Sequence, residues 1–467
     1  MAKAASGENP HTRAIAEFVA ALRYEAIPGE VVGRLKLLIL DALGCAVYAA
    51  QLPWSRILLD TLEAVDTSRG ASVWGTASRL SAPHAALVNG TLVQGFELDD
   101  VHRIGVLHVG AVTLPPLVAV AEMRPGMSGR DFLRAALAGY EVGPRVGICM
   151  GPGHIAQGWH SGATVGVFAA ASAAAAALKL PADRVVHALG IAGTQAAGLM
   201  AAQYGAMVKR MHAGRSAQSG LYGALLAERG FTGIVDVFES PYGGFCTTFS
   251  NSRDKFDLTA LSAELGERFE TMRVFLKFYA CNASVHSTLD VVKELRAKHR
   301  FGADDVERIR VRASRATSEH VGWRYRPEGL TGAQLNLPFC VATLLREGDV
   351  FVAQFEGAAV HDPGRIALAE RVEVEEDPSI TARGPSFRHM VHVEVRLKDG
   401  TVLADTIEAP RRNEQSFAGE ADVVGKFLKL AGGALPPGRA ERLVELTLGI
   451  DRAASVDPLV AALALPG

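Results

Sequence analysis

Two long stretches without a charged side chain constrain this chain more than any other feature of its sequence. They cover residues 161–178 and 185–208 and consist largely of alanine and glycine. Each is long enough to cross a membrane as a helix. Their apolar character comes from small side chains, however, and His187, Gln195 and Gln203 interrupt the second stretch. Both therefore predict helices buried at the centre of a bundle, where small residues permit close approach, and we expect no membrane span.

The first half of the chain has the apolar spacing of helices throughout. This spacing predicts helices over residues 31–48, 83–95, 114–122, 129–150, 162–178, 182–203 and 214–229. No clear alternation of apolar and polar residues precedes residue 265 or so. We therefore expect an all-helical domain.

The pattern changes after residue 265. Residues 306–313 alternate apolar and charged side chains, as a half-buried strand does. Residues 389–397 and 402–407 flank Lys398-Asp399-Gly400, a hairpin signal, and residues 372–376 predict another short strand. Helices are expected at 286–299, 334–346, 422–430 and 439–448. The sequence thus predicts a mainly α protein, with a large helical domain over 1–267, a smaller α+β domain over 268–410, and a return to the helical domain over 411–467.

Charge and cysteine content exclude several classes of protein. The 48 Lys and Arg residues oppose 50 Asp and Glu, a net charge of −2, so no basic excess is available to bind nucleic acid. The five cysteines are scattered without a CxxC pair, which argues against a disulfide framework, a zinc ribbon and an iron–sulfur cluster. The N-terminus has no apolar core of a secretory signal. A reducing, cytoplasmic setting is expected.

The sequence also lacks the common motifs of nucleotide and hydrolytic enzymes. It contains no GxxxxGK[ST], no strand–GxGxxG–helix unit, no GxSxG and no HExxH. Nucleotide and nicotinamide enzymes are therefore disfavoured.

Four segments place acidic residues, histidines or cations beside glycine and alanine. They are GFELDDVHRIGVLHVGAVTLPP (95–116), GWHSGATVG (158–166), VKRMHAGRSAQSG (208–220) and KFYACNASVHSTLD (277–290). Each has an ordinary structural explanation. Asp99 and Asp100 could cap a helix, His160 could be a helix cap or a core histidine, and the cluster at 209–215 could be a solvated loop between helices. His160 directly precedes the alanine-rich helix, whose N-terminal N–H groups favour an anion. Together the segments suit a pocket for a small, multiply charged anion.

A metal site is the competing explanation for these segments. No pair of candidate ligands has the i, i+4 spacing of a helix, and the neighbouring lysine and arginine residues would repel a cation. We therefore expect no metal.

At these segments the chain resembles the MmgE/PrpD family, which includes 2-methylcitrate dehydratase, cis-aconitate decarboxylase and iminodisuccinate epimerase. The resemblance covers nearly the whole chain and also includes GYEVGPRVG (139–147), GFTG (230–233) and AQLNLPFCVATLL (333–345). It implies a large helical domain and a smaller α+β lid, with the active site in the cleft between them. It further implies a homodimer that needs neither a metal nor an organic cofactor.

The resemblance also implies roles for individual residues. His108 and His160 would serve as acid and base, Lys209 would anchor a substrate carboxylate, His286 would contribute from the lid, and Asp99 would orient a histidine or bind a hydroxyl group. The substrate-binding residues expected around them are Asp100, Arg103, Arg210, His212 and Lys277. The chain departs from the family pattern at Val101, where decarboxylase-like members have threonine, and in a loop before His108 that is one residue longer. These departures leave the particular substrate and reaction open.

The family reactions share one physical problem. A proton or a carboxylate leaves a carbon next to a carboxylate, and the negative charge that builds up must be stabilised by fixed cations and donors. Lys209 and Arg210 are candidates for that role, and histidines can move the protons near neutral pH. We expect a cofactor-independent lyase acting on a small di- or tricarboxylate, with a hydro-lyase favoured over a decarboxylase or an epimerase. A non-catalytic carboxylate-binding protein is the alternative from another class, and the histidines and Lys209 at the motif positions argue against it.

Overall fold

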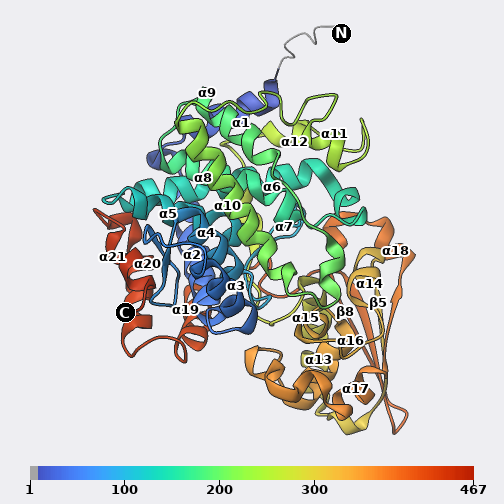
Figure 1. The fold of residues 1–467 in the computed structure, drawn as a ribbon. Helices are drawn as coiled ribbons and strands as arrows, with labels where there is room; N and C mark the ends of the chain where they lie inside the picture. The colour runs from blue at the N-terminus through green and yellow to red at the C-terminus, as the bar shows by residue number, and fades with distance from the viewer. Residues whose placement is uncertain (1–8, 467) are drawn as a thin grey trace.

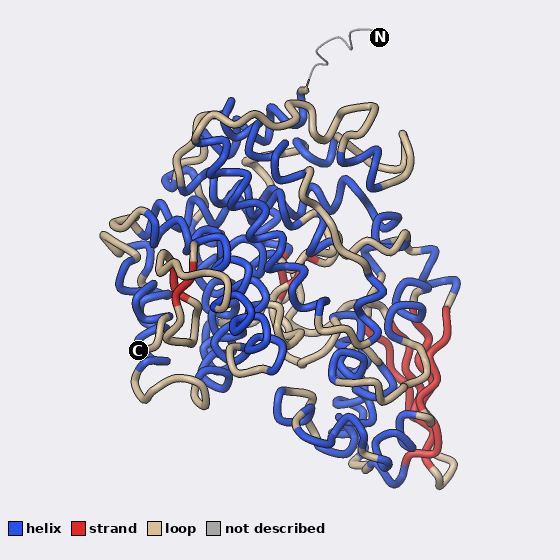
Figure 2. The backbone as a smooth tube through the Cα atoms, in the orientation of Figure 1, coloured by secondary structure: helices blue, strands red, loops and turns tan. Residues whose placement is uncertain are grey.

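The computed structural model describes residues 9–466 and has two parts, a large helical body and a smaller part that contains a sheet (Figure 1). Residues 1–8, on which the expectation of no secretory signal partly rests, and residue 467 lie outside the described residues. Helices predominate over strands (Figure 2), so the prediction of a mainly α fold is confirmed.

The helical body is built around the alanine-rich helix predicted from the sequence. It comprises α1 (Pro10–Ala21), α2 (Gly29–Ala49), α3 (Pro53–Glu63), α4 (Ala82–Val93), α5 (Val109–Met123), α6 (Gly129–Ala156), α7 (Ser161–Thr164), α8 (Gly166–Ala177), α9 (Ala182–Gly193), α10 (Val208–Glu228), α11 (Phe245–Phe249) and α12 (Thr259–Ser262). Helix α8 packs against α5, α6 and α10, and α10 also contacts α4 and α9. The predicted alanine-rich helix is therefore buried at the centre of the body.

Small residues are required where these helices meet. A Cβ atom at Gly214 of α10 would lie 2.0 Å from the carbonyl oxygen of Leu87 in α4. One at Gly220 would lie 2.3 Å from the Cβ atom of Ala170 in α8. Interiors are close-packed, so no larger side chain fits at these crossings.

No single helix among the described residues is both long enough and apolar enough to cross a membrane. Helices α2 and α3 meet the criteria of length and composition only as a pair, and the chain bends by 81° between them.

The smaller part carries a four-stranded sheet. Its strands β5 (Val306–Ala313), β6 (Val372–Glu376), β7 (Val391–Leu397) and β8 (Val402–Ile407) lie in the order β6-β5-β7-β8, with β5 and β6 parallel and the other pairs antiparallel. Its helices are α13 (Ala283–His299), α14 (Arg315–Val321), α15 (Leu330–Gln334), α16 (Leu337–Glu347), α17 (Pro363–Ala369) and α18 (Pro378–Ala382). Helix α13 packs against β7 and β8, and α16 packs against α13. The strands lie where the alternating pattern predicted them.

After the sheet the chain returns to the helical body. Helix α19 (Glu420–Ala431) packs against α2, and α20 (Arg439–Leu448) follows it. The last helix, α21 (Asp457–Leu463), contacts α5. Contact between α19 and α2 is close, because a Cβ atom at Gly44 would lie 2.9 Å from the ring of Phe427.

Two short antiparallel ladders lie inside the helical body. One joins β1 (Ala71–Ser72) to β2 (Arg79–Leu80). The other joins β3 (Val101–His102) to β4 (Val274–Phe275), with Val101 opposite Phe275. The second ladder brings the acidic segment at 97–100 next to the start of the KFYACN segment.

Several helix boundaries differ from the prediction, and two of these differences bear on the cationic cluster at 209–215. The helix expected over 182–203 ends at Gly193, and residues 194–207 form a loop with a short 3₁₀ helix, η2 (Met200–Tyr204). Helix α10 begins at Val208 rather than at residue 214, so the cationic cluster lies on its first turn and not in a solvated loop. Burial explains the difference, because Lys209 and Arg210 are both enclosed and both pair with the carboxylate of Glu97.

Candidate active site

The acidic segment between α4 and α5 is buried and has an unusual backbone conformation. Glu97 adopts φ 56°, in the left-handed region that non-glycine residues rarely enter. Lys426 of α19 fixes the segment by donating to the carbonyl oxygen of Leu98 (2.6 Å) while pairing with Asp41 (2.6 Å). Such strain persists only where the surroundings enforce it, and it concentrates at functional sites.

Glu97 is the centre of a buried cluster of three cations. It pairs with Lys209 through a short contact, with Arg210 at 2.7 Å and with Lys277 at 3.2 Å. Burial alone would raise the pKa of Glu97, but the three cations outweigh it and hold this pKa well below its usual value. Glu97 is therefore ionised and positions the two lysines.

His108 is held by the neighbouring carboxylate. Its Nδ1 atom lies 2.9 Å from Oδ2 of Asp99, and Lys277 lies 3.6 Å from the other oxygen of that carboxylate. Burial would raise the pKa of Asp99, but His108 and Lys277 more than offset it, so this pKa is lowered. Because Nδ1 is occupied, Nε2 is the ring nitrogen of His108 that remains for a ligand.

His160 and His212 form a second imidazole pair. Their Nδ1 atoms lie 3.0 Å apart, so one ring donates and the other accepts. Burial and the charge of Lys209 keep the pKa of His160 well below its usual value and lower that of His212 to about 4. Both rings are therefore neutral near pH 7, and the ring centroid of His160 lies 6.5 Å from that of His108.

His108, His160, Lys209 and Lys277 border a cavity that is partly open to solvent and lies between the two parts of the molecule. The helical body contributes polar residues together with an apolar wall, and the α+β part contributes the remainder. The lining residues are Val101, Arg103, Val106, His108, Ile155, His160, Met200, Lys209, Lys277, Asn282, Ala283, Ser284, His320, Arg388 and His389.

The structure thus brings several of the predicted residues together. His108, His160, Lys209, Lys277 and Arg103 all line the cavity. The guanidinium group of Arg103 contacts the carboxylate of Glu414 and the carbonyl oxygen of Ser386, so it already has partners.

Three predicted residues support the cavity from behind. Asp99 holds His108, His212 holds His160, and Arg210 shares the carboxylate of Glu97. Arg210 also donates to Gln334 of α15 (2.7 Å), which links α10 to the α+β part.

Asp100 and His286 lie elsewhere. Asp100 accepts hydrogen bonds from the backbone N–H of Gly110 (2.9 Å) and the hydroxyl of Tyr140 (2.8 Å), and burial raises its pKa to about 7. His286 is buried on α13 and borders a separate groove with Asp290 and Arg411. The structure does not place either residue on the wall of the cavity.

Five polar cavity residues did not stand out in the sequence. They are Asn282, Ser284, His320, Arg388 and His389. Asn282 caps α13 by accepting from the N–H of Ser284 (2.9 Å), and it belongs to a segment already singled out. His320 lies on α14, Arg388 and His389 lie just before β7, and no local motif marks any of the three.

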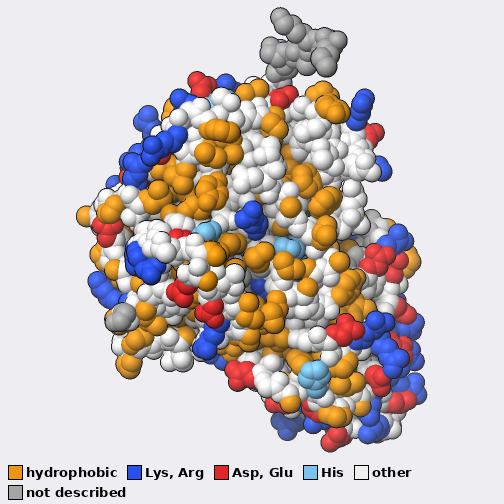
Figure 3. Space-filling view, in the orientation of Figure 1, with side chains coloured by type: hydrophobic (Ala, Val, Ile, Leu, Met, Phe, Trp, Pro, Cys, Tyr) orange, Lys and Arg blue, Asp and Glu red, His pale blue; other side chains and the backbone are white. Residues whose placement is uncertain are grey.

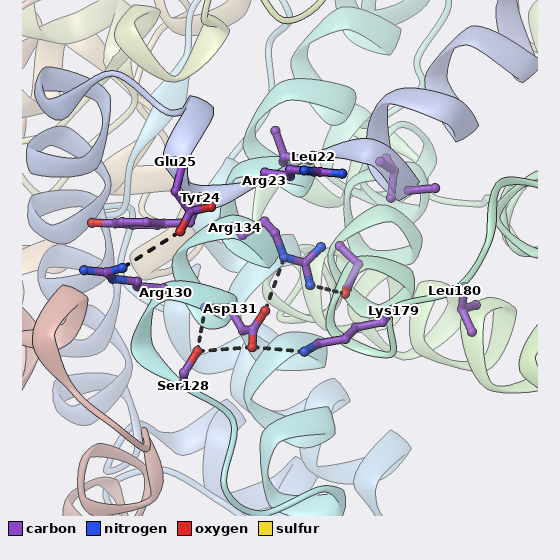
Figure 4. Close-up of a pocket in the computed structure, with 13 residues that line it drawn as sticks. Leu22, Arg23, Tyr24, Glu25, Ser128, Arg130, Asp131, Arg134, Lys179 and Leu180 are labelled. Atoms are coloured by element: carbon purple, nitrogen blue, oxygen red, sulfur yellow. Dashed lines mark hydrogen bonds and ion pairs between the residues drawn. The ribbon is translucent and has the colours of Figure 1, made fainter.

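A larger pocket elsewhere is a poor candidate. It lies among residues of α1, η1 (Tyr24–Ala26), α6 and the end of α8, and it contains no histidine (Figure 4). Asp131 already pairs with Lys179 (3.1 Å) and Arg134 (3.5 Å), so these cations have a carboxylate partner inside the pocket. Among residues 9–466, no group of three or more His, Cys, Asp or Glu side chains is arranged to hold a metal ion.

Two family models match the chain. The model for the MmgE/PrpD N-terminal domain matches residues 13–257, and the model for the MmgE/PrpD C-terminal domain matches residues 279–451. The chain belongs to the MmgE/PrpD family. The resemblance inferred from the motifs is therefore confirmed, and the cavity lies where the two matched domains meet.

Named MmgE/PrpD relatives cover the chain almost completely. The cis-aconitate decarboxylase-like protein oryM of Aspergillus oryzae is 33% identical over 469 residues, 96% of this chain and 96% of the relative. The cis-aconitate decarboxylase of Aspergillus terreus is 31% identical over 478 residues, 97% of this chain and 96% of the relative. The human cis-aconitate decarboxylase is 26% identical over 454 residues, 94% and 92% of the two chains. Family and names support a lyase, the enzyme class predicted from the sequence.

Proposed function

We propose that this chain is a decarboxylase of small unsaturated tricarboxylates of the cis-aconitate kind. The names of its relatives favour this alternative over the hydro-lyase preferred from the sequence. The observation that carries the proposal is one cavity in which His108 and His160 accompany Lys209 and Lys277. Such a cavity offers cations to carboxylates and imidazoles to a reacting carbon.

Charge in the cavity suits a polyanion. Glu97 and Asp99 oppose Lys209, Arg210 and Lys277, so this cluster retains a net positive charge. Glu97 and Asp99 also raise the pKa of Lys277 against the effect of burial, which keeps its ammonium group charged. A carboxylate that enters finds fixed positive charge and little water to compete with it.

The apolar wall suits the departing carboxylate. Val101, Val106, Ile155 and Met200 line this side of the cavity. A carboxylate that leaves as CO₂ loses its charge, so an apolar surface favours the product of that step over the starting anion.

The bond changes follow from the substrate class. When a CH₂–CO₂⁻ arm beside a C=C bond loses CO₂, the electron pair of the broken C–C bond forms a new C=C bond. The electrons of the original C=C bond then take a proton at the carbon next to another carboxylate. Lysine ammonium groups at that carboxylate stabilise the charge that develops there. One proton is consumed and one CO₂ is released.

His108 is suited to supply that proton. The ionised Asp99 holds its Nδ1 side at 2.9 Å and stabilises the positively charged ring, which donates from Nε2. His160 is neutral and contributes a hydrogen bond or accepts a proton. A general acid contributes about 10²–10⁴-fold, so the fixed cations supply much of the remainder.

The test is turnover in D₂O. Purified protein is incubated with cis-aconitate, citrate and 2-methylcitrate, and the mixtures are followed by NMR spectroscopy and CO₂ release. We expect CO₂ from cis-aconitate and one deuterium in the product, with none in the remaining substrate. Loss or addition of water without CO₂, or deuterium exchanged into the substrate, would instead favour the hydro-lyase or the epimerase.

A further inference from the structure

The α+β part contributes its own polar wall to the cavity. His320 is the next-to-last residue of α14, and Arg388 and His389 lie just before β7, separated from it by Met390. Lys209 and Lys277 line the same cavity from the other side of the domain boundary. A ligand in the cavity therefore meets positive charge from both parts of the molecule.

Several buried polar atoms of this wall have no hydrogen-bond partner within the described part of the chain. Nη2 of Arg388 lies 2.9 Å from Nδ1 of His320. A guanidinium group only donates, so Nδ1 of His320 is the acceptor and the neutral ring carries its proton on Nε2. This Nε2–H and the Nε–H of Arg388 are buried donors with no acceptor, and Nδ1 of His389 also lacks a partner.

One cation of this wall also has no carboxylate partner among the described residues. Lys209 and Lys277 pair with Glu97, and Arg103 pairs with Glu414. Arg388 has no carboxylate partner among residues 9–466, although it lines the same cavity.

Near neutral pH, Arg388 is positively charged and His320 is neutral. Burial and the nearby charge of Arg103 lower the pKa of Arg388 to about 10, so it stays positive. Burial and the charge of Arg388 lower the pKa of His320 to about 3, so it stays neutral.

An anionic acceptor would satisfy these buried donors and pair the Arg388 cation at the same time. Buried polar groups are satisfied in nearly all native proteins, and each exception calls for an explanation. We propose that Arg388 and the Nε2–H of His320 bind one carboxylate of the substrate, and that this contact makes the enzyme specific for polycarboxylates. The proposal rests on the proposed function in taking a polycarboxylate as the substrate.

The two walls then bind different carboxylates of the substrate. Lys209 and Lys277 bind the carboxylate at the reacting carbon, and Arg388 with His320 binds a different one. A substrate with a single carboxylate satisfies only one wall. A polycarboxylate links the helical body to the α+β part, so its binding also stabilises the contact between them.

The test uses tricarballylate, a saturated tricarboxylate that cannot lose CO₂ by the allylic route. Its affinity is measured by calorimetry for wild type, Arg388→Gln, Arg388→Lys and a matched control, Arg396→Gln. Arg396 lies on β7, pairs with Glu307 (3.2 Å) and is 55% exposed, so the control removes the same charge outside the cavity. Melting of each protein without ligand is recorded in parallel.

We expect Arg388→Gln to weaken tricarballylate binding about 10- to 100-fold, the range for losing hydrogen bonds to a charged group. Arg388→Lys should lose less and Arg396→Gln nothing. The ligand-free Arg388→Gln protein should melt no lower than wild type, because the substitution removes an uncompensated cation. A lowered melting temperature would indicate a structural role and overturn the proposal.

Two further outcomes separate this proposal from the proposed function. If Arg388→Gln binds tricarballylate as tightly as wild type, or if wild type does not bind it, Arg388 does not recognise a substrate carboxylate. If wild type binds tricarballylate in an Arg388-dependent way but releases no CO₂ from cis-aconitate, the carboxylate contact stands and the decarboxylase assignment fails.

Discussion

At the scale of single residues, adjacent carboxylates of the acidic segment have different tasks. Glu97 holds three cations, Asp99 holds His108, and Asp100 holds the N-terminus of α5 and Tyr140. The sequence identifies all three as acidic residues beside glycine. It does not show which of them meets a cation, because that depends on α10 and β4 arriving from more than a hundred residues away.

Lys209 provides the first prediction at this scale. Lys209→Ala removes the side chain that anchors a substrate carboxylate, so kcat/KM should fall. The decrease should correspond to a loss of about 2–5 kcal/mol of transition-state stabilisation. The fold should survive because Arg210 and Lys277 still neutralise Glu97. Lys179→Ala, which removes a lysine that is 66% exposed, serves as the control. Near-normal turnover of Lys209→Ala would assign Lys209 a purely structural role.

The two cavity histidines provide the second prediction. His108→Ala and His160→Ala should each lose most turnover, by about 10²–10⁴-fold, while still binding a polycarboxylate, because they move protons rather than anchor charge. Steady-state kinetics and calorimetry separate the two effects. Full activity in both variants would refute their assignment and leave the family membership unchanged.

At the scale of elements, α10 combines the chemistry of the site with the packing of the core. Its first two turns carry Lys209, Arg210 and His212, and its glycines further along let α4 and α8 approach. The long uncharged stretches made the buried helices predictable. The start of α10 was not predictable, since three cationic or polar residues within four positions are typical of a solvated loop until Glu97 is placed beside them.

Two glycines test this packing. Gly214→Ala should lower the melting temperature strongly, because its Cβ atom would lie 2.0 Å from a backbone carbonyl oxygen and overpacking costs about 1–3 kcal/mol or more. Gly425→Ala in α19, where nothing lies within 4 Å of the new Cβ atom, should instead stabilise by about 0.5–1 kcal/mol. Thermal denaturation of the two variants should therefore shift in opposite directions. Equal shifts would contradict the close packing inferred for α10.

At the scale of the whole molecule, the sequence predicted the mainly helical fold and its separate sheet. It predicted less well which residues line the cavity. The change from helical spacing to alternation located the sheet, because both patterns are local. Arg388 and His320 enter the cavity only through the way the sheet docks on the helical body. Such long-range placement leaves no periodic trace, so the wall contributed by the α+β part could not be predicted.

Oligomeric state is a prediction at this scale. The family resemblance predicts a homodimer, and Figure 3 shows hydrophobic side chains gathered on one face of the helical body. The large hydrophobic side chains exposed on α10 and the loop before it are Leu199, Tyr204, Met207, Val208, Tyr222 and Leu226. We expect a dimer by light scattering and a shift toward monomer for Tyr222→Arg combined with Leu226→Arg. A wild-type monomer at micromolar concentration would refute the prediction.

Stability should also depend on pH through two buried carboxyl groups. Burial raises the pKa of Asp100 and of Glu141 to about 7, far above the ordinary values of 3.8 and 4.5. Between these values the folded protein holds protons that the unfolded chain has released, so stability falls as pH rises. The contribution is complete below about pH 4, is lost as pH rises through 7, and amounts to roughly 4 kcal/mol for Asp100.

Asp100→Asn isolates one of these groups. The amide has no proton to lose in this range, its oxygen can still accept from Gly110, and its NH₂ group can donate to Tyr140. Melting temperatures are therefore compared at pH 5 and pH 8 for wild type and variant. We expect wild type to lose more stability than Asp100→Asn between these values, with a residual decline in the variant from Glu141. Parallel curves would mean that Asp100 is already ionised in the folded protein at pH 5, and that the hydrogen bonds from Gly110 and Tyr140 outweigh its burial.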